Sequence, residues 1–96
     1  NLETDLYTAI RDLNDGQRRY ELYDQKQIQR VEQAINIMME SYSSEASDFE
    51  EILRLQRKLL GYQLKRIQAE ADVFTANSYI RNLTGAKNTS LNEINY

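Results

Sequence analysis

The chain has no histidine, no cysteine and no proline, and only three glycines among its 96 residues. Without cysteine and histidine there are no disulfides, no zinc site of the usual kind and no catalytic triad built on imidazole. Without proline, and with so little glycine, few residues interrupt a helix anywhere in the chain. The composition therefore predicts an all-α protein that is not an enzyme, with no cofactor and no metal site.

The chain also lacks a large excess of charge and long apolar runs. Its 12 basic and 15 acidic residues give a net charge of -3, and the basic residues are spread out, which disfavours nucleic-acid binding. No run is apolar enough to predict a membrane-spanning helix, and the pattern of these residues does not predict a signal peptide among them. Because helical spacing already starts at Leu2, we interpret the chain as a single helical unit that is a fragment of a longer protein.

Two amphipathic stretches fill most of the sequence. In the first half, apolar residues fall at spacings of three, four and seven, with one step of eleven from Tyr20 to Val31, which predicts a helix over about residues 2–42: Leu6, Ile10, Leu13, Tyr20, Val31, Ile35, Met38 and Tyr42. The turn-forming residues Asn14 to Gly16 leave two alternatives open. The first helix either continues through them, at about 60 Å for some forty residues, or breaks there to give three helices.

The second half carries a seven-residue repeat of large apolar side chains, at Leu53, Leu60, Ile67 and Phe74. This coiled-coil-like spacing predicts a helix over about residues 48–84 that ends at Gly85 as a C-terminal cap, with a flexible tail over 86–96. If the repeat faces the first helix, the remaining apolar residues project to one side. A further surface then has to cover them, either neighbouring segments of a parent protein or a second copy that forms a four-helix bundle.

Between the two stretches, residues 43–47 are small and polar and predict the tip of an antiparallel helical hairpin. Ser47 and Glu50 form a Ser-x-x-Glu pattern that predicts a capping box, and Glu50 is four residues before Arg54, as in a favourable helical ion pair. The acidic residues near the tip offer carboxylates for acid–base chemistry or a hard cation. Helix capping on a solvated tip explains them more simply.

The tip and the start of the second helix also resemble a known family. Eight positions agree with the TolC-like outer-membrane efflux channels in the segment after the hairpin turn: Asp48, Phe49, Ile52, Leu53, Gln56, Arg57, Leu59 and Leu60. Similarity extends over roughly residues 20–85, through Glu21-Leu22-Tyr23, Val31-Glu32-Gln33-Ala34 and Leu83-Thr84-Gly85. Glu45 stands where the family usually has glycine.

The resemblance implies a periplasmic helical hairpin from near the C-terminus of an efflux subunit of a Gram-negative bacterium. Sister subunits of a homotrimer then form a tube, and the missing barrel of the parent protein supplies the membrane contact. It also implies that an adaptor (membrane fusion) protein docks on the tip, at Tyr42, Ser43, Ser44, Glu45, Ala46 and Ser47. Candidates for lining the aperture are Asp48, Glu51 and Arg54, where Arg54 inverts the charge expected at its position.

A second function stays open beside this one. The alternative is a free-standing coiled-coil scaffold or protein-interaction module whose partner lays a helix on the uncovered apolar face. As an isolated hairpin it is also expected to form a self-dimer.

Overall fold

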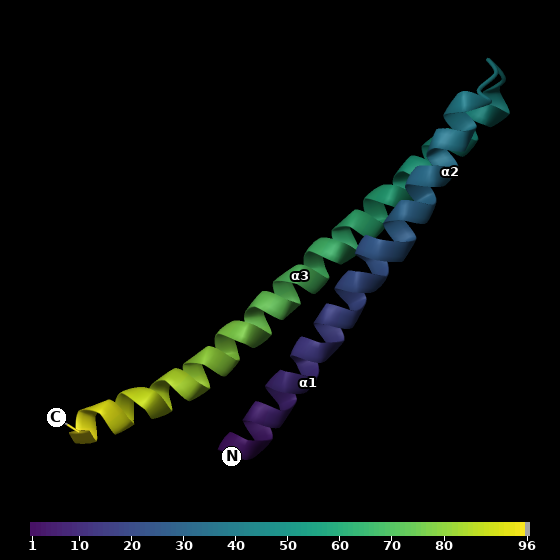
Figure 1. Cartoon of the computed structure of the whole chain (residues 1–96). Helices are drawn as coiled ribbons and strands as arrows, with labels where there is room; N and C mark the ends of the chain where they lie inside the picture. Colours follow the sequence, from purple (N-terminus) through teal and green to yellow (C-terminus); the bar gives the residue numbers. More distant parts are fainter. Residues whose placement is uncertain (96) are drawn as a thin grey trace.

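The chain folds into one long antiparallel helical hairpin (Figure 1). The computed structural model describes the backbone of residues 1–95 and the side chains of residues 1–85. Four helical segments follow one another: α1 (Leu2–Glu21), a π-helical turn η1 (Leu22–Gln27), α2 (Ile28–Glu40) and α3 (Ala46–Asn95). The described backbone contains no strand, and its extents are 74 × 24 × 16 Å. The predicted all-α hairpin is confirmed.

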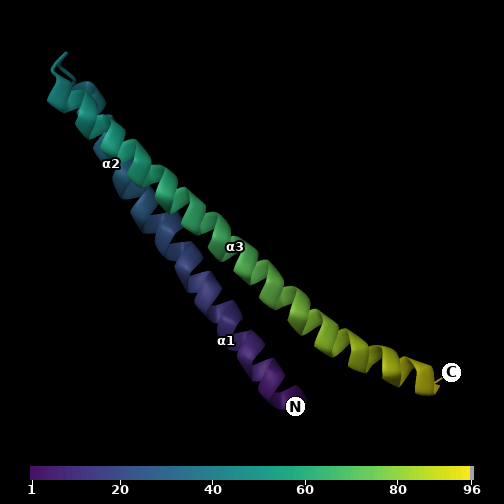
Figure 2. The ribbon, with the colours of Figure 1, turned by 180° about the vertical axis from the view of Figure 1, so that it is seen from behind.

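The first arm runs from α1 to α2 and the second arm is α3 alone (Figures 1 and 2). Both chain ends lie at the end of the hairpin opposite the tip. The first arm begins with a capping interaction, since the Asn1 side chain accepts a hydrogen bond from the Thr4 N–H at 2.9 Å. Acidic residues in the first turn and basic residues in the last turn of α1 complement the helix dipole.

The two arms approach each other closely at Gly16. This glycine is buried inside α1, which continues through it without a break, so the uninterrupted alternative is confirmed and the three-helix alternative is wrong. A Cβ atom at this position would lie 2.9 Å from Cγ2 of Val73 on α3. The glycine is therefore not a turn signal, because its missing side chain lets α1 pack against α3.

The π-helical turn adds one residue to the first arm. Along α1 and into η1, the residues turned toward α3 are spaced by four and three residues, at Ala9, Leu13, Gly16, Tyr20 and Tyr23. The next one in α2 is Ile28, five residues after Tyr23. At this step the Ile28 N–H donates to the Tyr23 carbonyl, the hydrogen bond of a π-helix. The extra residue keeps Val31 in the interface, where an unbroken α-helix would place Arg30.

The face of α3 that packs on the first arm differs from the predicted one. Its buried and half-buried residues alternate at spacings of three and four, and we call them the inner seam: Ile52, Leu55, Leu59, Tyr62, Arg66, Ala69, Val73, Ala76, Ile80 and Leu83. The predicted repeat lies mostly outside it, since Leu60, Ile67 and Phe74 are exposed and Leu53 is half-buried. The two repeats run in parallel one residue apart. The sequence pattern indicated the exposed repeat because its side chains are larger, whereas the inner seam consists partly of alanine.

The ends of the helices also correct the predicted bounds. The tip covers residues 41–45, two residues earlier than expected, because α2 ends at Glu40 and α3 already begins at Ala46. The Ser41 hydroxyl donates to the carbonyl of Ile37 at 3.0 Å and helps to end α2. Gly85 has no positive φ and does not cap α3, which continues to Asn95. The predicted flexible tail is thus helical over residues 86–95, and Tyr96 lies outside the described residues.

Candidate docking surfaces

The tip is held by one side-chain contact across the turn. The backbone N–H of Ser43 donates to Oδ2 of Asp48 at 3.1 Å, and the Ser43 hydroxyl donates to the same atom at 2.6 Å. Both hydrogen bonds lower the pKa of Asp48, and the one from the hydroxyl has the larger effect. The carboxylate therefore ties the end of the loop to the first turn of α3.

This clamp replaces the predicted capping box. Ser47 lies inside the first turn of α3, too late to cap it. Asp48 rather than Glu50 makes the contact across the turn. The predicted pair of Glu50 with Arg54 is likewise replaced, because Arg54 binds Glu51 through two hydrogen bonds of 3.0 and 2.6 Å. The hydrogen bond from Arg54 also lowers the pKa of Glu51.

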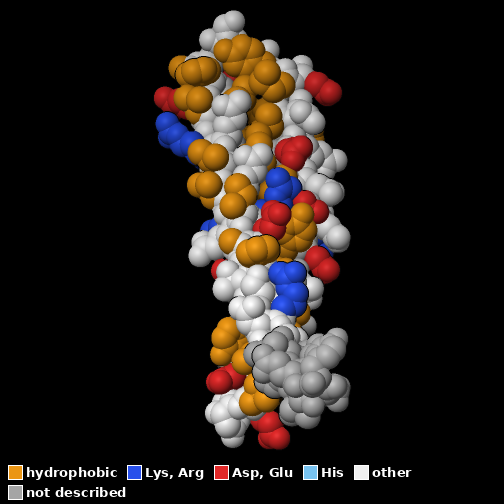
Figure 3. Space-filling view, turned by 90° about the vertical axis from the view of Figure 1, so that its left-hand side faces the viewer, with side chains coloured by type: hydrophobic (Ala, Val, Ile, Leu, Met, Phe, Trp, Pro, Cys, Tyr) orange, Lys and Arg blue, Asp and Glu red, His pale blue; other side chains and the backbone are white. Residues whose placement is uncertain are grey.

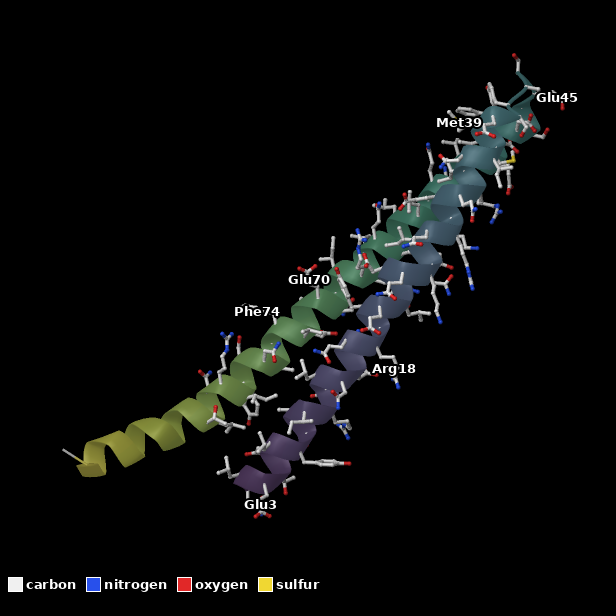
Figure 4. The ribbon with its side chains drawn as sticks, viewed as in Figure 1. Glu3, Arg18, Met39, Glu45, Glu70 and Phe74 are labelled. Atoms are coloured by element: carbon white, nitrogen blue, oxygen red, sulfur yellow. The ribbon has the colours of Figure 1, made fainter. Side chains whose placement is uncertain are left out.

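The predicted adaptor-contacting residues all lie at the free end of the hairpin. Tyr42 to Glu45 belong to the loop, whereas Ala46 and Ser47 open α3, and every one of the six is exposed. Figure 4 shows Glu45 at the extreme end of the molecule, remote from both termini. The three aperture candidates follow within the first three turns of α3, and two of them, Glu51 and Arg54, neutralise each other.

Charge is segregated along the chain around the tip. Residues 31–51 include six acidic and no basic side chains, whereas residues 52–69 include five basic and no acidic ones. The acidic segment contains the tip, and the basic segment is the adjoining part of α3. The tip thus presents negative potential at the end of the hairpin. Among the described residues, no group of three or more carboxylates converges to hold a metal ion.

A polar and aromatic belt crosses the middle of the hairpin beside the π-helical turn. Arg19 binds Asp72 at 2.9 Å, and Asp24 binds Arg66 at 2.8 Å. The Tyr23 and Tyr62 rings also pack across the arms, with centroids 5.8 Å apart. Sequence reasoning missed this belt, although Asp24 interrupts the apolar stripe of the first arm. Arg66 gives a second signal, since it falls in the seven-residue repeat that starts at Ile52.

Arg19 also joins the belt to α1. Its second hydrogen bond goes to Asp15 at 2.9 Å, and this contact, the largest of several, lowers the pKa of Asp15. The hydrogen bonds to Asp72 and Asp15 in turn raise the pKa of Arg19. Beside the belt, a groove of about 390 Å³ between α1 and α3 is lined by Ala9, Asp12, Asp15, Arg19, Asp72, Thr75, Ala76 and Tyr79.

The other surface feature is the uncovered side of α3. Figure 3 shows hydrophobic side chains following one another along the side of the molecule on which α3 lies. We call the exposed apolar row of α3 the outer stripe, and its members are Leu60, Leu64, Ile67, Ala71 and Phe74. In Figure 4 Phe74 projects from α3 away from α1. The sequence indicated that an apolar face would stay uncovered, but it assigned Leu60, Ile67 and Phe74 to the contact between the arms.

Comparison with known proteins does not assign this hairpin to a family. No family model, no curated protein and no solved structure matches the chain. Within the described residues, none of the helices combines the length and the apolar character that crossing a membrane requires. The class that the fold defines is an all-α helical hairpin of coiled-coil character.

Proposed function

We propose that this chain is a periplasmic helical hairpin of an outer-membrane efflux channel. It forms part of the tube wall, and its tip is the docking mouth for the adaptor of a tripartite export system. Sister subunits of a homotrimer and the adaptor are its partners. The proposal places no chemical step on the chain, which acts through helix packing and recognition at the tip.

One observation supports this function best. The hairpin has an inner seam that joins its own arms and, on α3, a second apolar row that stays exposed among the described side chains. A helix in the wall of a tube needs both, because it contacts its own hairpin on one side and a neighbouring helix on the other. The sequence resemblance over roughly residues 20–85 supplies the particular family.

The exposed tip supports the docking role. Tyr42 adds an aromatic side chain to it, and the clamp between Ser43 and Asp48 holds the loop in one shape before any partner binds. A preformed loop loses little conformational freedom on docking. Glu45 takes the place of the usual glycine, so the tip presents a carboxylate side chain to the adaptor at this position.

Cysteine cross-linking in the full-length parent protein tests this proposal. Because the 96 residues contain no cysteine, Glu45→Cys introduces the one thiol of this hairpin, at its tip, and any cysteines elsewhere in the parent protein are replaced beforehand. We expect it to cross-link to the adaptor, whereas Glu21→Cys, exposed in the middle of the first arm, does not. Equal cross-linking from both positions, or from neither, contradicts tip docking. The same reading frame is expected to encode barrel strands and an export signal upstream.

The second candidate is a free-standing coiled-coil scaffold, which the outer stripe supports equally well. A scaffold of this kind binds a partner helix along α3 and has no special use for the tip. A complete reading frame that holds only this hairpin favours the scaffold. A reading frame with barrel strands favours the channel.

A further inference from the structure

The outer stripe repeats the spacing of a coiled-coil seam. Its residues follow one another at intervals of four, three, four and three, the same alternation as the inner seam on the other side of α3. Its large members are strongly exposed: Leu60 55%, Leu64 57%, Ile67 59% and Phe74 67%. Such a row is built to receive one more helix along α3, because knobs-into-holes packing requires this repeat.

The borders of the outer stripe indicate what kind of helix fits it. Most of the positions that flank it carry no charge: Gln56, Gln63 and Asn77 on one border, and Gly61, Gln68 and Thr75 on the other. The flanking exceptions are Glu70 and Arg54, and Arg54 is already bound to Glu51. Flanking charges normally select one partner and repel identical chains. Their near absence removes the repulsion that two copies of this chain would otherwise feel.

Side-chain size gives the orientation. If two copies of α3 pack antiparallel about a two-fold axis between residues 65 and 66, Leu60 lies opposite Ala71 of the second copy, and Leu64 lies opposite Ile67. A large residue then meets a small one in the outer layers and two middle-sized residues meet at the centre. This alternation fills the space between helices without voids.

The charge at Arg57 selects this register over its neighbours. Arg57 occupies a position of the same repeat and forms no ion pair with another described side chain. In the register above it lies opposite Phe74, where its guanidinium packs on the ring. A shift of one heptad in one direction places Phe74 opposite Glu50, and a shift in the other places Arg57 opposite Arg81. Both shifted registers bring unfavourable contacts.

We propose that this chain forms an antiparallel dimer through the outer stripe, in which the two copies of α3 pack side by side in the middle of a four-helix layer with the first arms on the outside. Two-fold symmetry makes every contact occur twice, so each favourable pair counts double. The dimer leaves both acidic tips free at opposite ends. It concerns the 96-residue chain alone and stands independently of the efflux function.

Sedimentation equilibrium tests the dimer. We expect a dimer at micromolar concentration, and Leu64→Glu or Ile67→Lys to raise its dissociation constant by at least about tenfold, since each buries a charge. Ile37→Glu is the matched control, because Ile37 is 60% exposed but lies on α2, and its dimer is expected to persist. A wild-type chain that stays monomeric up to about 1 mM, or equal loss in the control, overturns the proposal.

Mixing the two charged variants tests the register. Residue 64 of one copy faces residue 67 of the other, so an equimolar mixture of Leu64→Glu and Ile67→Lys is expected to recover the dimer as a heterodimer. Circular dichroism of each variant alone shows whether its hairpin still forms. No recovery in the mixture while both variants are helical rejects this register.

Spin labels at the tip test the orientation. With a label attached through Glu45→Cys, the antiparallel dimer separates the two labelled positions by about 60 Å along the axis. A parallel dimer brings them within roughly two helix diameters. A short distance therefore overturns the antiparallel arrangement. A monomeric chain would leave cross-linking at the tip of the parent protein unaffected, so the two proposals fail separately.

Discussion

The contact between the two arms is built differently in the two halves of the hairpin. Near the tip it consists of large aliphatic side chains, and its most buried members are Ile28, Val31, Ile52 and Leu55. In the half near the termini its most buried members are Ala9, Gly16, Ala69 and Ala76. Small residues hold two helices by letting their backbones approach, whereas large residues hold them by filling the space between. One hairpin uses both means.

The polar belt and the π-helical turn lie at the boundary between these two halves. The extra residue in η1 is needed there, because the residues of α2 that face α3 come one position later than the repeat of α1 would place them. The ion pair of Asp24 with Arg66 fixes the pairing of the arms at this point. We therefore expect the half near the tip to lose stability when side-chain volume is removed, and the half near the termini to lose stability when volume is added.

The largest effect is expected from removing volume near the tip. Ile28→Ala should lower the free energy of unfolding by about 2 kcal/mol or more, since Ile28 is 3% exposed and its loss leaves a cavity. Ile37→Ala is the same change on the same helix at a 60% exposed site. It should stay within about 0.5 kcal/mol of wild type. Urea denaturation at one protein concentration measures both, and equal losses contradict the inner seam.

Adding volume in the other half should cost somewhat less. Ala69 is fully buried against the first arm, so Ala69→Leu forces the arms apart at an expected cost of about 1–3 kcal/mol. The neighbouring Gln68 is exposed, and Gln68→Leu is expected to be nearly neutral. Thermal unfolding of the two variants is the measurement. A stabilised Ala69→Leu variant contradicts close packing in this half.

Two glycines of α1 and α3 sharpen the comparison further. A Cβ at Gly61 meets nothing within 4 Å, so Gly61→Ala should stabilise the helix by up to about 1 kcal/mol. At Gly16 the same gain is opposed by the contact with Val73, whose branched side chain has little freedom to move. We expect Gly16→Ala to lose about 1 kcal/mol, and Val73→Ala in the same chain to relieve the clash. If both glycine-to-alanine substitutions stabilise the protein, or both destabilise it, the close approach at Gly16 is disproved.

The belt between the halves should contribute little to stability. Asp24 and Arg66 are both about one-third exposed, and ion pairs of this kind typically contribute about 0–1 kcal/mol. A double-mutant cycle with Asp24→Ala and Arg66→Ala should give a coupling in that range. A coupling above about 2 kcal/mol means instead that the pair is buried.

The smallest effect concerns acid. The pKa of Asp48 at the tip and that of Asp15 near the termini are both lowered in the folded chain. Their stabilising contribution is complete above the unfolded pKa and is lost as the pH falls through the lower folded pKa. Ser43→Ala removes the hydroxyl donor, which is the largest cause of the lowered pKa of Asp48. NMR titration of this variant should therefore show a higher pKa for Asp48 and an unchanged pKa for Asp15. A parallel rise at both carboxyls contradicts the tip clamp.

Much of the fold was readable from the sequence because both arms carry a strong helical repeat and no proline interrupts them. The position of the tip was predicted within two residues, since apolar spacing stops there. Sequence reasoning failed at α3, where two repeats run one residue apart and only one faces the first arm. It ranked Leu60 and Phe74 above Ala69 and Ala76 by size. Burial in a close-packed seam depends on fit rather than on size.

The polar contacts were harder to predict for a related reason. The sequence contains several acidic and basic side chains that could form each ion pair. Which of them pair depends on their exact positions around the helix, within a fraction of a turn. Arg54 prefers Glu51 over Glu50, and Asp48 replaces the expected cap at Ser47. These preferences cost little energy to change, so local spacing rules alone do not select among them.

The amino-acid sequence by itself determined that this chain is a helical hairpin with a small, acidic, exposed tip. Local propensity and apolar periodicity suffice for that, because each acts within a few turns of one helix. Only the tertiary structure decided which of the two apolar rows of α3 joins the arms, that Gly16 is a contact rather than a break, and that one extra residue enters as a π-helical turn. Those three features depend on how two helices fit against each other, and no single helix carries that information.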